Sequence, residues 1–118
     1  MKKILIVEDD SIIISILVFL LKKEGYEVFI AKDGDEGIIK IGEIKPDLII
    51  TDILMPYKSG LDLLAFSRRD YPSLPIIVIS SLGKEDFTVI EAFKMGVKDF
   101  IAKPFNPIEL VAIVGKYL

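Results

Sequence analysis

The chain has 118 residues, 52% hydrophobic and 28% charged, with a formal net charge of −3 and neither cysteine nor histidine. These values suit one globular domain with a single core, and the negative charge argues against nucleic-acid binding, which needs a basic face. Disulfides, thiolate chemistry and the commonest general base are excluded. Any bound metal should be a hard, oxygen-liganded ion such as Mg²⁺.

Apolar runs and turn residues alternate along the chain in a pattern that predicts strands and helices in turn. The expected strands cover residues 3–7, 26–30, 47–51, 76–79 and 99–102, and the expected helices cover residues 11–24, 35–44, 61–70, 85–95 and 107–118. Strict alternation with short connections implies a parallel sheet covered by helices on both faces. We therefore expect an α/β, doubly wound fold.

Helix-terminal residues support these boundaries. Ser11 is the expected N-cap of the first helix, and Gly25 should end it. Asn106 is the expected N-cap of the last helix, with Pro107 at its first position and Glu109 at its third, an order typical of helix starts.

Two apolar stretches near the N-terminus do not fit an export signal or a membrane span. The run over residues 4–7 ends at the acidic Glu8, and the run over residues 12–21 is shorter than the about 20 residues that a bilayer requires. We expect one cytoplasmic domain over residues 1–118 that does not contact a membrane.

Reactive side chains follow four of the five expected strands. Glu8 and Asp9 follow the first strand, Asp52 the third, Ser80 the fourth and Lys103 the fifth. Singly, each has an ordinary explanation as a helix-end charge, turn former, cap or solvated lysine. The carboxyl ends of parallel strands share one sheet edge, however, where ligands bind in such folds. We therefore expect these side chains to form one site.

The residue types at this edge indicate phosphoryl transfer. Crowded carboxylates repel one another, and a divalent cation such as Mg²⁺ relieves that repulsion and binds phosphate oxygens. Lys103 can attract an anion and Ser80 can donate a hydroxyl hydrogen bond. Asp52 is the natural nucleophile, since a carboxylate can form an aspartyl phosphate without a general base.

The ordered set of motifs resembles the receiver domain of the response regulators of two-component signal transduction, in the CheY-like superfamily. The resemblance spans the whole chain and rests on residues 4–10, 46–56, 75–81 and 103–105, with Gly60 and Gly96. It implies a flavodoxin-like three-layer αβα sandwich with strand order 2-1-3-4-5. It also implies a cis peptide bond between Lys103 and Pro104.

The same resemblance implies roles for individual residues. Asp52 would accept the phosphoryl group, and Mg²⁺ would be bound by Glu8, Asp9, Asp52 and the backbone carbonyl of Leu54. Asp10 matches a variable position and is a weaker metal candidate. Lys103 would be the counter-ion of the phosphoryl group.

The resemblance further implies a switch with protein partners. Ser80 would move onto the phosphoryl group, and Phe100 matches the aromatic switch position, although an ordinary apolar role in the strand fits it equally well. The phosphoryl donor would be a sensor histidine kinase or a phosphotransfer protein, and the reader an effector or a fused output domain. Catalysis would be limited to self-catalysed phosphotransfer and dephosphorylation.

Two positions and one helix depart from the common family pattern. Ser81 replaces the usual alanine, and Ile113 stands where winged-helix members usually carry arginine, which puts their charged dimer contacts in doubt. The helix over residues 11–24 is unusually apolar. We expect Ile13, Ile16, Leu17 and Leu20 to face the core, with Ile14 and Val18 on another face. That face is either an apolar surface for kinase docking or self-association, or simply a covered side of an isoleucine-rich helix.

Three other functions remain open at this point. A phosphohydrolase with an aspartate nucleophile would want a second aspartate at position 54, where this chain has leucine. A flavodoxin-like cofactor binder would want a glycine- or hydroxyl-rich phosphate loop after the first strand, where this chain has three acidic residues. A degenerate receiver that is not phosphorylated would lack site residues that this chain retains.

Overall fold

The computed structural model describes residues 1–53 and 60–118, in which five parallel strands form one sheet in the order β2-β1-β3-β4-β5. The strands are β1 (Lys3–Val7), β2 (Glu27–Ala31), β3 (Leu48–Asp52), β4 (Ile76–Ser80) and β5 (Asp99–Ala102). The helices are α1 (Ser11–Lys23), α2 (Gly34–Ile44), α3 (Gly60–Asp70), α4 (Phe87–Lys94) and α5 (Pro107–Lys116). The predicted fold class and strand order are confirmed.

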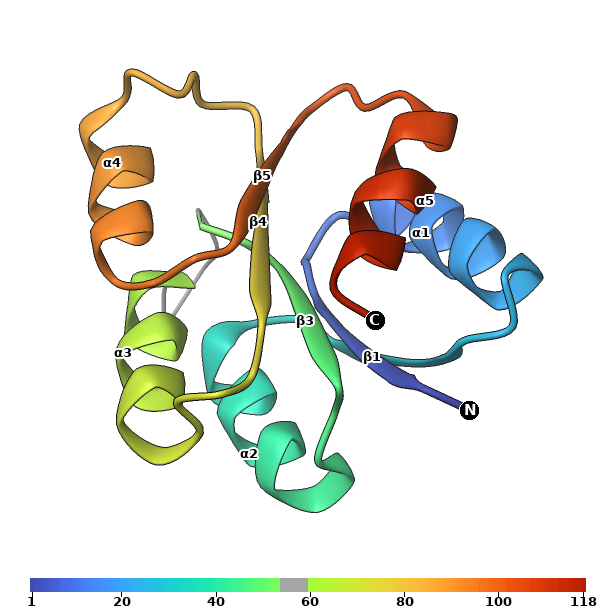
Figure 1. Ribbon diagram of the computed structural model, residues 1–118, viewed down its shortest axis with the longest axis horizontal. Coiled ribbons are helices and arrows are strands. Elements are labelled where there is room, and N and C mark those ends of the chain that lie inside the picture. The colour runs from blue at the N-terminus through green and yellow to red at the C-terminus, as the bar shows by residue number, and fades with distance from the viewer. Residues whose placement is uncertain (54–59) are drawn as a thin grey trace.

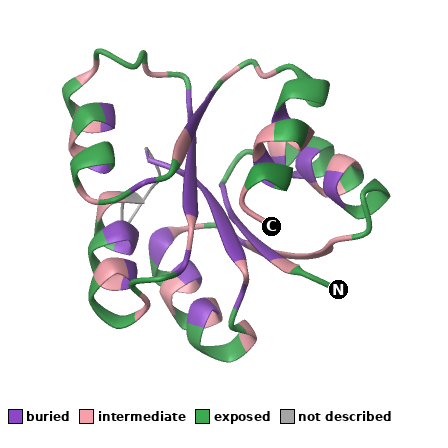
Figure 2. Cartoon of the chain, viewed as in Figure 1, coloured by how far each residue is buried: buried purple, intermediate pink, exposed green. Residues whose placement is uncertain are grey.

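The sheet is the middle of three layers (Figure 1). Helices α1 and α5 cover one face, and α2, α3 and α4 cover the other. Each face has its own apolar cluster: Leu17 and Leu110 belong to the first, and Leu63 and Val89 to the second. Figure 2 shows the central strands buried along their length, while the helices are buried only on their inner sides.

The two central strands explain why the sheet forms here. Every residue of β3 and of β4 is buried, which matches the continuous apolar runs typical of parallel strands covered on both faces. The register pairs Val7 with Thr51 and Asp52 with Ile79. Because the strands end nearly level, the residues that follow them meet at one edge of the sheet.

At the starts of two helices, α1 and α4, an aspartate beside the expected boundary is the N-cap. Asp10, not Ser11, is the N-cap of α1, and its carboxylate accepts hydrogen bonds from the backbone amides of Ile12 and Ile13. Asp86 caps α4, which therefore begins at Phe87 rather than residue 85. The Asn106 cap of α5 is confirmed.

The remaining boundaries are close to those expected. Strand β2 begins and ends one residue later than predicted, and so does β3, which therefore includes Asp52. Gly25 lies just beyond α1 with a φ of 91°, a left-handed conformation that glycine adopts without steric cost. The Lys103–Pro104 peptide bond is cis, as predicted. Among the described residues, no helix combines the length and apolar character needed to cross a membrane.

The predicted core face of α1 is right only in part: Leu17 is buried and Ile13 and Leu20 pack half-buried against the same cluster, but Ile16 is 40% exposed. The fully buried residues of α1 are Ile14, Leu17 and Leu21, and only 8% of Ile14 is exposed. Val18 is half-buried against the same cluster. The predicted docking face at Ile14 and Val18 is therefore covered, because the helix is rotated by about one residue from the predicted stripe. The exposed apolar side chains of α1 are Ile12, Ile16 and Phe19.

Candidate functional site

Side chains from β1, β3 and β5 meet at the carboxyl edge of the sheet. Glu8 follows β1, Asp52 ends β3 and Lys103 follows β5. Glu8 is fully buried, Asp52 is 7% exposed, and the neighbouring Asp9 is exposed. Residues distant in the sequence thus form one compact, charged group.

Glu8 is held in place by the start of α1. One of its carboxylate oxygens, Oε2, accepts hydrogen bonds from the backbone amides of Asp9 at 3.0 Å and Asp10 at 3.1 Å. The Glu8 amide donates to the carbonyl of Ala31 at 3.0 Å. These contacts orient the other oxygen, Oε1, toward Lys103, which lies 2.7 Å away.

Lys103 joins two acidic residues. Its Nζ lies 2.7 Å from Glu8 Oε1 and 2.7 Å from Asp52 Oδ2. Its backbone amide donates to the carbonyl of Ser80 at 2.8 Å, which fixes the strand end that carries it. Because the lysine side chain is only 16% exposed, solvent screens these ion pairs less than it would at the surface.

Burial and charge shift two pKa values in the site. Burial raises the pKa of Glu8, although the hydrogen bonds from Lys103 and from the Asp10 amide oppose that shift. For Lys103, burial alone would lower the pKa, but the hydrogen bonds to Asp52 and Glu8 outweigh it and raise the pKa. The lysine therefore stays charged and offsets part of the negative charge of the carboxylates.

Three carboxylates are arranged to bind a cation. Glu8, Asp9 and Asp52 each offer an oxygen, and these oxygens lie within 4.8 Å of one another. Hard oxygen donors of this kind suit Mg²⁺, which binds one or two carboxylates and retains several waters. The predicted fourth ligand, the carbonyl of Leu54, lies outside the described residues.

Ser80 and Phe100 lie on the strands beside the acidic group. Ser80 ends β4, is 1% exposed, and its Oγ accepts a hydrogen bond from the Leu82 amide at 3.1 Å. Phe100 is 7% exposed and belongs to the same apolar cluster as Val89 and Ala92 of α4. Phe100 of β5 and the buried residues of α4 therefore share one apolar cluster.

Two features of the site were not predicted from the sequence. The Lys103–Glu8 ion pair was missed because lysine was assigned only to the phosphoryl group. Thr51 was also missed: it is fully buried, and its Oγ1 donates to the carbonyl of Asp52 at 2.9 Å. A hydroxyl residue inside a continuous apolar run was the available signal, since buried polar groups need partners.

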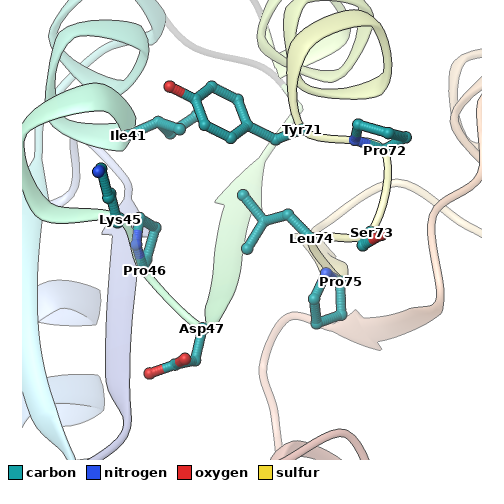
Figure 3. A pocket seen from close by; sticks show the side chains of 9 residues that line it. All are labelled: Ile41, Lys45, Pro46, Asp47, Tyr71, Pro72, Ser73, Leu74 and Pro75. Atoms are coloured by element: carbon teal, nitrogen blue, oxygen red, sulfur yellow. The ribbon is translucent and has the colours of Figure 1, made fainter.

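The site is distinct from a cavity of about 460 Å³ at the opposite edge of the sheet. Figure 3 shows that cavity between the α2–β3 connection, at Lys45 and Asp47, and the α3–β4 connection, at Tyr71 and Leu74. None of Glu8, Asp9, Asp52 or Lys103 lines it.

Comparison with known proteins agrees with the fold and the acidic cluster. Residues 4–115 match the response regulator receiver domain family. The match covers nearly the whole chain, and the chain therefore belongs to this family. A receiver domain is a phosphorylation-controlled switch of two-component signalling, and the cluster of Glu8, Asp9 and Asp52 is typical of its phosphorylation site.

Individual relatives show the same likeness. The chain is 40% identical over 116 residues to the chemotaxis protein CheY of Thermotoga maritima. The aligned region includes 98% of this chain and 96% of CheY. The response regulator TrrA of the same organism, solved with Mg²⁺ and BeF, has 33% identity and a TM-score of 0.88, and each chain is covered fully (100%). NtrX of Brucella abortus has 32% identity and a TM-score of 0.91. The match includes all of this chain (100%) but only 27% of the NtrX chain.

Proposed function

We propose that residues 1–118 act as one receiver domain in which Asp52 accepts a phosphoryl group in the presence of Mg²⁺. The observation that carries this proposal is the convergence of Glu8, Asp9 and Asp52 oxygens within 4.8 Å, with Lys103 Nζ 2.7 Å from Asp52. Such a group supplies the nucleophile, the metal ligands and the cationic contact that phosphoryl transfer needs.

In the proposed reaction an oxygen of the Asp52 carboxylate attacks the phosphorus of a phosphohistidine. The phosphorus–nitrogen bond of the donor breaks as the new phosphorus–oxygen bond forms, and the departing imidazole takes a proton from solvent. Glu8, Asp9, Asp52 and the carbonyl of Leu54 would hold Mg²⁺. Bound there, the ion neutralises charge on the transferred phosphoryl oxygens. Lys103 contacts the product from the other side.

The phosphorylated state differs from the present one in the charge beside Lys103 and Ser80. Lys103 exchanges a contact with the Asp52 carboxylate for one with a phosphoryl oxygen, and the Ser80 hydroxyl donates to another. Moving Ser80 changes the space beside β4 that Phe100 can occupy. Because Phe100 belongs to the same apolar cluster as Val89 and Ala92 of α4, the charge at Asp52 would bias the conformation of α4 and β5.

A surface that a partner could read lies on α4. Phe87, Ile90 and Phe93 occupy successive turns of this helix and are 73%, 40% and 41% exposed. Exposed apolar side chains at this spacing form a surface suited to another protein. We propose that a cytoplasmic sensor kinase or phosphotransfer protein supplies the phosphoryl group and that an effector or fused output domain binds this surface.

The proposal is tested by incubating the protein with a small phosphoryl donor, such as phosphoramidate, and Mg²⁺. Mass spectrometry should show a gain of one phosphoryl group that requires Mg²⁺. Asp52→Asn should abolish the gain. Asp47→Asn, at the opposite edge of the sheet, is the matched control and should not. No gain in the native protein, or an equal gain in Asp52→Asn, would refute the proposal.

A further inference from the structure

The outer side of α1 carries an exposed apolar stripe. Ile12, Ile16 and Phe19 are 70%, 40% and 67% exposed, and their spacing places them on one face over two helical turns. Ser15 lies beside them and is also exposed. Its hydroxyl donates to the Ser11 carbonyl at 2.9 Å, so it already has a partner within the helix. The stripe is therefore apolar, with a small residue near its centre.

The two ends of this stripe carry opposite charges. Asp9 and Asp10 are exposed at the amino end of α1. Lys22 and Lys23 are exposed in its last turn, followed by the exposed Glu24 at the C-cap, so that end keeps one net positive charge. A copy of the same helix in antiparallel orientation would place its lysines beside these aspartates, and the reverse at the other end. A parallel copy would bring like charges together. The stripe is thus complementary to itself in one orientation.

We propose that α1 pairs with α1 of a second copy of this chain in an antiparallel, twofold-symmetric dimer. The axis passes close to Ser15 and Ile16, midway between Ile12 and Phe19. Each Ile12 then contacts the Phe19 of the other copy, as an isologous interface requires. This inference does not depend on phosphorylation of Asp52.

Ile108 and a hollow beside α1 extend the apolar surface of the stripe, but the whole surface remains small. Ile108, at the start of α5, is 82% exposed and lines a cavity of about 310 Å³ with Leu20, Lys23 and Glu24 of α1. This hollow adjoins the stripe near Phe19. A surface of a few side chains buries less area than stable interfaces do, so the dimer should be weak and concentration-dependent. The attraction between the charged ends of the two helices should weaken as the salt concentration rises.

Engineered cysteines test the geometry directly, because the native chain has none. Ser15→Cys should form a disulfide-linked dimer under mild oxidation, since residues at a twofold axis approach within the bridging limit of about 7 Å between Cα atoms. Ser73→Cys, on an exposed loop away from α1, is the control and should cross-link far less. Equal cross-linking of the two variants would overturn the proposal.

Mixed cysteine variants test the orientation. Ile12→Cys mixed with Phe19→Cys should cross-link more than either variant alone, because antiparallel pairing puts these positions opposite each other. Two copies of Ile12 would lie about 10 Å apart along the axis, beyond a disulfide's reach. Stronger cross-linking of each variant with itself would contradict the antiparallel arrangement.

Sedimentation tests association without cysteines. Native protein should show a rising average mass between about 10 μM and about 1 mM, the range in which a weak dimer forms. Ile16→Glu should remain monomeric throughout. Ile39→Glu, a matched change on the outer side of α2 where Ile39 is 60% exposed, should behave as the native protein does. A native protein that stays monomeric at all concentrations would refute the proposal.

Discussion

The ammonium group of Lys103 lies at the same distance, 2.7 Å, from Glu8 Oε1 and Asp52 Oδ2. Those two carboxylates are also members of the three-carboxylate cluster that suits a divalent cation. A lysine and a metal ion on the same acidic group repel each other. Lys103 offsets part of the negative charge of this cluster, and it would therefore limit how tightly a metal could bind there.

Replacing Lys103 should therefore strengthen metal binding while impairing phosphotransfer. We expect Lys103→Met to bind Mg²⁺ about tenfold more tightly, equivalent to about 1.4 kcal/mol, because a nearby positive charge is removed. Calorimetric titration measures this change. Lys98→Met removes the same charge at the amino end of β5 and should leave the affinity unchanged. Weaker Mg²⁺ binding by Lys103→Met would show that the lysine helps to organise the metal ligands.

Two adjacent aspartates should respond differently to the same substitution. Asp9 offers an oxygen to the carboxylate cluster, whereas Asp10 caps α1 through the amides of Ile12 and Ile13. We expect Asp9→Asn to weaken Mg²⁺ binding by about tenfold or more, because a charged ligand is lost. Asparagine caps helices as well as aspartate does, so Asp10→Asn should preserve the helix and change Mg²⁺ affinity far less. Similar losses in both variants would assign Asp10 to the metal site.

The role of Phe100 can be separated from its contribution to the core. Phe100→Leu should cost less than about 1.5 kcal/mol of stability if the cluster repacks, so the variant should fold. Beryllium fluoride with Mg²⁺ can serve as a stable mimic of the phosphoryl group. We expect it to shift the NMR signals of α4 in the native protein and to shift them much less in Phe100→Leu. Equal shifts would leave Phe100 with a packing role only.

Asp99, the first residue of β5, should make the stability of the protein depend on pH. Its Oδ2 accepts from the Tyr117 hydroxyl at 3.0 Å and lies 3.5 Å from Lys116 Nζ. Partial burial would raise the pKa of Asp99, but hydrogen bonds from the Phe100 amide and Tyr117, together with the charge of Lys116, outweigh it and hold the pKa below 3.8.

A lowered pKa means that the ionised carboxylate stabilises the folded state. This contribution is fully present above the ordinary pKa and is lost as the pH falls through the lower, folded value. We expect Asp99→Asn to lower the free energy of unfolding by about 1–2 kcal/mol at pH 7. The difference from the native protein should disappear as the pH falls through the lowered pKa of Asp99. Urea unfolding at several pH values measures it, and a difference that persists in acid would point to packing instead.

The order of the elements and the carboxyl-edge cluster were predictable because both follow from strong local patterns. A short apolar run such as residues 76–79, bounded by Pro75 and Ser80, is typical of a buried strand rather than a helix. Each candidate residue follows a strand, and parallel strands bring such residues to one edge. The ion-pair partner of each charged residue was not predictable from the sequence. The Lys103–Glu8 pair depends on the positions of β1 and β5 in the sheet, which the sequence pattern alone does not give.

The orientation of α1 was not predictable for a related reason. A helix that is apolar on nearly every side has no polar face to mark which side is exposed. Several stripes fit the sequence equally well, and tertiary packing selected Ile14, Leu17 and Leu21. The cap of α1 was ambiguous because Asp10 and Ser11 are both good N-caps and adjoin each other. Only the hydrogen bonds to Ile12 and Ile13 distinguish them.

The most direct test of the account is to locate the phosphoryl group on the chain. Protein treated with a phosphoryl donor and Mg²⁺ can be reduced with borohydride, which converts an aspartyl phosphate to homoserine, and then sequenced by mass spectrometry. We predict homoserine at position 52 and at no other aspartate. Homoserine at position 9 or 10, or its absence from the whole chain, would contradict the assignment of Asp52 as the phosphoryl acceptor.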